Sequence, residues 1–110
     1  MAYDEHLAER VREIVAAEAG LVEKKMFGGL AFLIAGNMAV AASGQGGLLL
    51  RCDPAETEKL RAKPGAGSFV MRGKAMEGWL RVETDAVKTK RQLETWVGRG
   101  VAYVRTLPPK

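Results

Sequence analysis

The sequence has 110 residues, of which 47% are hydrophobic and 27% charged, so it holds enough apolar material to bury one core. This length excludes a second folded domain, and we expect a single domain over residues 1–110. The composition excludes a disordered or collagen-like chain. The net charge of +4 permits an acidic partner without requiring one.

The cysteine count and the apolar runs bear on location. Cys52 is the single cysteine, which excludes an internal disulfide and a multi-cysteine metal site and fits a reducing compartment. The first six residues are acidic and polar, unlike an export signal. The most apolar run, residues 26–42, is interrupted by glycines and is shorter than the about 20 residues that span a membrane. We therefore expect a cytoplasmic protein that does not enter a membrane.

The first half of the chain predicts one helix followed by strands. Apolar residues at helical spacing indicate a helix from its N-cap Asp4 to about Ala19. Glycine-punctuated apolar runs then indicate strands, because glycine permits the tight turns between them. Gly36 and Asn37 predict a two-residue hairpin turn. The predicted strands are residues 22–27, 30–35, 38–42 and 48–52.

The second half predicts two helices that flank two short strands. Asp53 and Pro54 form a helix start, and this helix is expected to end near Ala62. The strands are residues 69–71 and 78–82, and the last helix is expected to begin at residue 84 or 85 and to stop at Pro108. Because no strand–helix–strand alternation occurs, the order predicts a two-layer α+β sandwich with an antiparallel sheet packed against helices.

The sequence holds no convergent catalytic set. His6 is the single histidine, which excludes a two-histidine relay, and a solvated helix residue is the simpler interpretation. Cys52 is either a nucleophile with a lowered pKa or a buried packing residue, and the second interpretation is favoured. The glycine-rich stretch at residues 44–47 leads into a strand and does not match a phosphate-binding loop. We expect no catalytic residue, metal or cofactor.

Basic residues are unevenly distributed along the chain. Residues 1–55 hold five Lys or Arg and seven Asp or Glu, whereas residues 56–110 hold twelve and six, so the halves carry −2 and +6. At helical spacing, part of this charge lies on one arc of the last predicted helix. The arc is formed by Lys88, Arg91, Arg99 and Arg105. It either follows a phosphate backbone or is an ordinary solvated face, and the second interpretation is favoured.

One motif resembles the signature of a known family. The residues Glu23 to Phe32, EKKMFGGLAF, followed by Gly36-Asn37-Met38, Gly78-Trp79 and the C-terminal WVGRG and LPPK, are similar to the TfoX/Sxy N-terminal domain family over roughly residues 3–110. The resemblance implies a secretion-chaperone-like α+β fold in the order α-β(3)-α-β(2)-α. By fold analogy it also suggests a homodimer.

The resemblance also implies a function. Longer members of the family regulate natural competence genes together with a cyclic-AMP receptor protein at promoters. Because this chain ends at Lys110, we expect direct promoter activity to need parts that it does not hold. The leading hypothesis is a non-enzymatic cytoplasmic regulatory or adaptor domain that contacts a protein partner. The alternatives are a nucleic-acid-binding protein that uses the basic C-terminal helix and a small-ligand-binding domain.

The family motif has two interpretations. In the first, the motif is an interaction site. In the second, Met26 and Phe27 fill the core, and Gly28 and Gly29 permit a turn or bulge between strands. The second, structural interpretation is favoured. Lys24 and Lys25 alternate along a strand, so one of the two is expected to face solvent or a partner. The candidate interaction residues of the motif are Lys24, Lys25, Met26, Phe27, Gly28 and Gly29.

Overall fold

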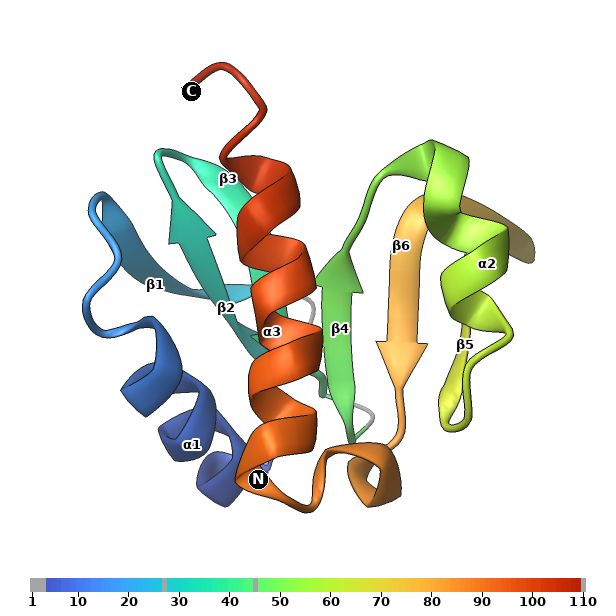
Figure 1. The fold of residues 1–110 in the computed structure, drawn as a ribbon, viewed down its shortest axis with the longest axis horizontal. Coiled ribbons are helices and arrows are strands. Elements are labelled where there is room, and N and C mark those ends of the chain that lie inside the picture. Colours follow the sequence, from blue (N-terminus) through green and yellow to red (C-terminus); the bar gives the residue numbers. More distant parts are fainter. Residues whose placement is uncertain (1–3, 27, 45, 110) are drawn as a thin grey trace.

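Six antiparallel strands form one sheet, and three helices lie against one of its two faces (Figure 1). The computed structural model describes residues 4–26, 28–44 and 46–109. The strand order is β1-β2-β3-β4-β6-β5, so every neighbouring pair except β4 and β6 follows directly in the chain. The strands are β1 (Leu21–Met26), β2 (Gly29–Ile34), β3 (Asn37–Ala42), β4 (Leu48–Arg51), β5 (Ala66–Met71) and β6 (Lys74–Val82). The helices are α1 (Glu5–Val15), α2 (Thr57–Arg61) and α3 (Lys90–Val104), with short 3-10 helices η1 (Pro54–Glu56) and η2 (Thr84–Val87).

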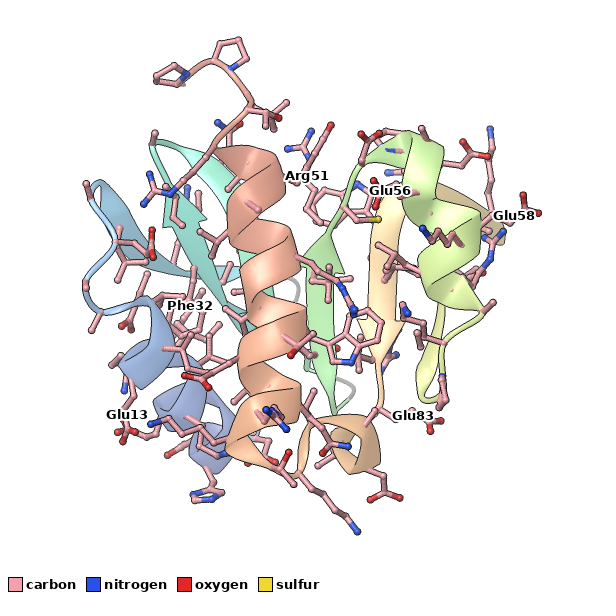
Figure 2. All side chains as sticks on the ribbon, viewed as in Figure 1. Glu13, Phe32, Arg51, Glu56, Glu58 and Glu83 are labelled. Atoms are coloured by element: carbon pink, nitrogen blue, oxygen red, sulfur yellow. The ribbon has the colours of Figure 1, made fainter. Side chains whose placement is uncertain are left out.

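The main core lies between the helices and one face of the sheet. Phe32 of β2, Val40 of β3 and Leu50 of β4 are fully buried there. Figure 2 shows the labelled Phe32 beneath the helical layer. The helices contribute side chains at helical spacing, which gives α1 and α3 one apolar side each. These side chains are Leu7, Val11 and Val15 from α1 and Leu93, Trp96, Val97 and Val104 from α3.

Helix α3 lies very close to the centre of the sheet. A Cβ atom added at Gly100 would stand 2.5 Å from the carbonyl oxygen of Ala39 in β3, so a side chain at this position would displace the helix. The helix begins at Thr89, whose side chain accepts a hydrogen bond from the backbone of Gln92 while the Gln92 side chain accepts one from Thr89. The reciprocal cap at Thr89 therefore fixes where α3 begins, and glycine at position 100 allows this helix to lie close to the sheet.

The structure confirms the α+β fold class and changes several boundaries. The fourth predicted strand exists as β4, so four strands precede α2, one more than the order that the resemblance implied. Helix α1 ends at Val15 rather than near Ala19. The last helix begins at Lys90, because residues 84–87 form η2 and the capping box at Thr89 starts α3.

The hairpin between β2 and β3 turns one residue earlier than predicted. Ala35 and Gly36 form the turn, with φ of 53° and 86°, and Ile34 pairs with Asn37. Asn37 therefore begins β3, and its buried side-chain amide donates a hydrogen bond of 3.0 Å to the carbonyl oxygen of Pro108. Asn37 thus connects the sheet to the C-terminal segment instead of serving as the turn residue.

Candidate functional site

The sheet face opposite the helices, here called the open face, carries its own apolar cluster. Ala31, Met38, Ala41 and Leu49 are 0–8% exposed and form this second cluster, apart from the main core. The strand register explains the separation, because successive side chains of a strand point to opposite faces. Phe32, for example, faces the helices, whereas its neighbours Ala31 and Leu33 belong to the open face. Partly buried apolar residues surround the cluster, namely Met26, Leu33, Phe69 and Trp79.

Curvature of the sheet buries this cluster without a covering helix. Met26 of β1 and Phe69 of β5 lie on the two opposite edge strands, yet both line one hollow of about 380 Å³. The sheet therefore bends so that its edges approach one another over the open face. The remaining lining comes mainly from small or apolar residues. The residues important here are Met26, Ala41, Leu49, Phe69, Val70 and Arg72.

Aromatic and cationic side chains stack at one end of the sheet, where Arg51 lies between Trp79 of the open face and Tyr103 of α3. The guanidinium of Arg51 lies 5.4 Å from the ring centroid of Trp79 and 5.8 Å from that of Tyr103. Figure 2 shows Arg51 at the end of β4, beside the C-terminal part of α3. Phe69 packs against Trp79 with their ring centroids 6.3 Å apart. These contacts hold the rings of Trp79 and Phe69 on the open face against neighbours within the fold.

The charged side chains that the register assigns to the open face are cationic. Lys24 pairs with Ala31, Arg51 with Trp79, and Arg81 with Leu49, which places the three cations on this side of β1, β4 and β6. Arg81 also donates a hydrogen bond of 2.7 Å to the carbonyl oxygen of Gly46. Sequence reasoning missed this surface, because neither β1 (LVEKKM) nor β2 (GLAFLI) alternates apolar and polar residues.

The family motif forms the β1–β2 hairpin at the edge of the hollow. Both Lys24 and Lys25 are exposed, and the register places them on opposite faces of the sheet. Met26 is partly buried and packs on the second cluster, whereas Phe27 lies outside the described residues. Gly28 has a φ of 75° in the turn. A Cβ at Gly29 would stand 2.1 Å from the carbonyl oxygen of Ala42, so this glycine allows close contact between β2 and β3.

Three of the four predicted basic residues of the C-terminal region contact individual partners within the fold. Lys88 precedes α3 rather than lying on it, and its ammonium is 3.6 Å from the Asp85 carboxylate. Arg105 pairs with Glu18, and the Arg99 guanidinium lies 4.4 Å from the centroid of the Trp96 ring. Arg91 is exposed on the first turn of α3. These contacts weaken the view of the four residues as one continuous phosphate-binding stripe.

The candidate reactive residues stand apart from one another. His6 is exposed on α1, whereas Cys52 is buried after β4. Burial raises the pKa of the Cys52 thiol, and a contact of 3.7 Å to the Thr57 hydroxyl partly opposes that rise. A raised pKa disfavours the thiolate that a nucleophile requires. Within the described ranges, no three His, Cys, Asp or Glu side chains gather as metal ligands.

Comparisons with known proteins place the fold and the motif in a family. No helix in the described part of the chain is long and apolar enough to cross a membrane. No curated protein and no solved structure matches the sequence. The sequence model of the TfoX N-terminal domain matches residues 13–103, which include the Lys24 to Gly29 motif, all six strands and nearly all of α3. The chain therefore belongs to the TfoX N-terminal domain family, which is linked to competence regulation.

Proposed function

We propose that this chain is a non-enzymatic regulatory or adaptor domain that acts in the cytoplasm by contact with another protein, in transcription or competence-type regulation. The observation that carries the proposal is the open face. Its apolar cluster is shielded by the bend of the sheet and by neighbouring side chains rather than by a helical layer. Around this buried cluster, the hollow and the exposed side chains of Val22 and Val70 leave apolar surface in contact with water. Exposed apolar surface bordered by polar residues is typical of interaction sites.

Exposed valines on both edge strands support this assignment. Val22 of β1 is 57% exposed and Val70 of β5 is 56% exposed. The register places Val22 opposite Leu33 on the open face, and Val70 lines the hollow. A partner that covers both valines removes them from water, which stabilises the complex by about 25 cal/mol per Å² of buried apolar surface. They therefore extend the interaction surface from the centre of the sheet to its edges.

Site-specific photo-crosslinking in cells tests the proposal. A photoreactive amino acid replaces Val22 or Val70 on the open face, and in matched controls it replaces Thr95 or Ala102 on the exposed side of α3. We expect one partner protein to crosslink from the open-face positions and not from the α3 positions. The partner is then identified by mass spectrometry and its binding is reproduced with both proteins purified. Adducts from all four positions, or from the α3 positions alone, would contradict an open-face contact.

The volume of the hollow favours a second candidate, a small-ligand-binding domain. About 380 Å³ lies at the lower end of the range for small-molecule pockets, which is about 300–1,000 Å³. Thermal unfolding across a panel of metabolites tests this function. A melting shift that disappears in a Val70→Glu variant supports ligand binding in the hollow. An unchanged melting temperature across the panel removes this candidate.

The basic C-terminal residues give a third test, for nucleic acid. Fluorescence anisotropy with labelled duplex DNA and single-stranded RNA is measured at about 50 and 200 mM salt, because each phosphate contact on duplex DNA contributes a slope of about 0.9. We expect weak binding, since Lys88 and Arg105 each face a carboxylate. Steep salt dependence that Arg91→Ala combined with Arg99→Ala removes would instead favour nucleic acid over the protein partner.

A further inference from the structure

The chemistry of the open face restricts the kind of protein that it contacts. Building on the proposed function, we propose that the hollow binds an acidic segment of a different protein. In this complex, one large apolar side chain of the partner enters the hollow, and the partner's carboxylates lie beside Lys24 and Arg72.

The lining of the hollow accounts for the apolar part of the segment. Met26, Leu49, Phe69 and Val70 provide apolar contact from three different strands, β1, β4 and β5. Methionine is unbranched and polarisable, so Met26 can adapt to the shape of an incoming side chain. A volume of about 380 Å³ accommodates a side chain, whereas a whole helix requires a longer groove. The occupant is therefore an anchor residue and the chain on either side of it.

Charge complementarity accounts for the acidic part of the segment. Arg72 is the one charged residue among those that line the hollow in the described structure. The charged strand residues that the register assigns to the open face are Lys24, Arg51 and Arg81. Arg51 stacks on Trp79 and Tyr103, and Arg81 donates a hydrogen bond to Gly46, so Lys24 and Arg72 are the cations on which the proposal depends. The exposed Glu77 lies in the irregular part of β6, which the register does not assign to a face. Carboxylates on a partner would be attracted to this surface, which increases the association rate and selects against basic partners.

The same charges argue against a second copy of this chain as the occupant. Two open faces in a symmetric contact would bring cations of one copy close to cations of the other, because such an interface is self-complementary. Like charges placed together at an interface disfavour the complex. The open face therefore requires a partner whose sequence differs from its own.

The aromatic contacts favour a protein segment over single-stranded nucleic acid. Sheet surfaces that bind nucleic acid use exposed ring faces on which bases stack. Here the guanidinium of Arg51 lies near the ring centroid of Trp79, and Phe69 packs against the same ring. A base would have to displace these neighbours before it could stack. An anchor side chain that enters the hollow requires no such displacement.

Peptide selection followed by affinity measurement tests the proposal. The full chain is immobilised, a display library of random peptides about 12 residues long is selected against it, and the enriched peptides are made with a fluorescent label. We expect enriched peptides with a net negative charge and at least one large apolar residue. Binding is then measured by anisotropy, with a labelled single-stranded RNA of about 12 nucleotides for comparison.

Two matched pairs of variants locate the binding site. Lys24→Glu reverses a charge on the open face, and Lys25→Glu reverses the neighbouring charge on the other face. We expect Lys24→Glu to weaken peptide binding about tenfold and Lys25→Glu to change it less than about twofold. Val70→Glu places a carboxylate at the hollow and is expected to weaken binding at least about tenfold. Its control is Ala102→Glu, which places the same carboxylate on the exposed side of α3, away from the open face.

The outcomes separate this proposal from the proposed function. Neutral or basic enriched peptides, no enrichment, or binding that Lys24→Glu and Val70→Glu leave unchanged would overturn the acidic-segment proposal. RNA that binds more tightly than the peptides and loses affinity in Val70→Glu would overturn it in favour of nucleic acid. If photo-crosslinks still form from the open face in any of these cases, the adaptor function stands with a different partner chemistry.

Discussion

The two faces of the sheet bury apolar residues by different means. On the face covered by α1 and α3, large side chains such as Phe32 and Leu50 are fully buried under helices. On the open face, burial depends on small residues such as Ala31 and Ala41 and on the bend that brings β1 and β5 together. The difference separates two roles. We expect the helical layer to contribute more of the folding free energy, whereas the hollow and the exposed Val22 and Val70 of the open face are accessible for binding.

Adjacent residues of β2 provide the strongest test of this comparison. Phe32→Ala empties a buried site beneath the helices, and we expect it to reduce the free energy of unfolding by about 3–5 kcal/mol. Leu33→Ala removes a partly buried side chain from the open face, and we expect a loss of about 1–2 kcal/mol. Urea unfolding measures both losses.

If Phe32→Ala does not fold, a milder substitution at the same position still allows the two faces to be compared. Phe32→Leu keeps most of the apolar volume, so we expect a loss of about 1 kcal/mol and a measurable unfolding transition. Equal losses for Phe32→Ala and Leu33→Ala would show that the two faces contribute alike, and the division of roles would be wrong.

Glycines of two strands test the close packing in the family motif. Gly29→Ala would place a Cβ 2.1 Å from the carbonyl oxygen of Ala42, and we expect a loss of about 1–3 kcal/mol in the free energy of unfolding. Gly67→Ala is the control, because a Cβ there meets no atom within 4 Å. We expect Gly67→Ala to be neutral or to stabilise β5 by a few tenths of a kcal/mol. If Gly29→Ala left the free energy of unfolding unchanged, the close approach of β2 to β3 would not explain why position 29 is a glycine.

Much of the fold could be predicted from local signals. Glycine punctuation and apolar runs were sufficient to predict β1 to β4, and Asp53 before Pro54 marked the start of η1, where the Asp53 side chain accepts a hydrogen bond from Ala55. The predicted start of the last helix, at residue 84 or 85, was wrong because Thr84 and Asp85 resemble a helix cap. Thr89 and Gln92 form the stronger, reciprocal cap, and residues 84–87 make a separate short helix.

The candidate site was harder to predict because it depends on distant parts of the chain. The residues of β3 are buried on both faces, so their sequence lacks the alternation that would identify an open face. Met26 and Phe69 are brought to one hollow by the bend of a six-stranded sheet, which no local pattern encodes. The partners of Arg105 and Arg99 are likewise settled by tertiary packing, although both arginines were identified as helix-surface residues.

The junction between β4 and α2 predicts an unreactive thiol. Cys52 is buried and its pKa is raised mainly by that burial, so we expect iodoacetamide to alkylate it at least about tenfold more slowly than free cysteine at neutral pH. Mass spectrometry measures the rate, and the same reaction in urea is the control, where the rate should approach that of free cysteine. Alkylation of the folded protein at the rate of free cysteine would revive the nucleophile hypothesis.

The smallest expected effect concerns the ion pair that joins α1 to the edge strand β1. Arg12 donates two hydrogen bonds, of 2.6 and 2.9 Å, to the Glu23 carboxylate. These bonds lower the pKa of Glu23 below its usual value of 4.5, although partial burial acts in the opposite direction. The unfolded chain therefore takes up the proton more readily than the folded one. The contribution of the pair is present at neutral pH and is lost as the pH falls through the folded-state pKa.

Glu23→Gln should accordingly reduce stability by less than about 1 kcal/mol at pH 7, because the pair is exposed to solvent and screened by salt. Urea unfolding as a function of pH should show the difference from the unmodified chain shrinking in the acid range. Glu13→Gln, on the exposed side of α1 (Figure 2), is the matched control and should change stability less. A Glu23→Gln loss that persisted at acid pH would mean that Glu23 holds β1 against α1 through packing rather than through its charge.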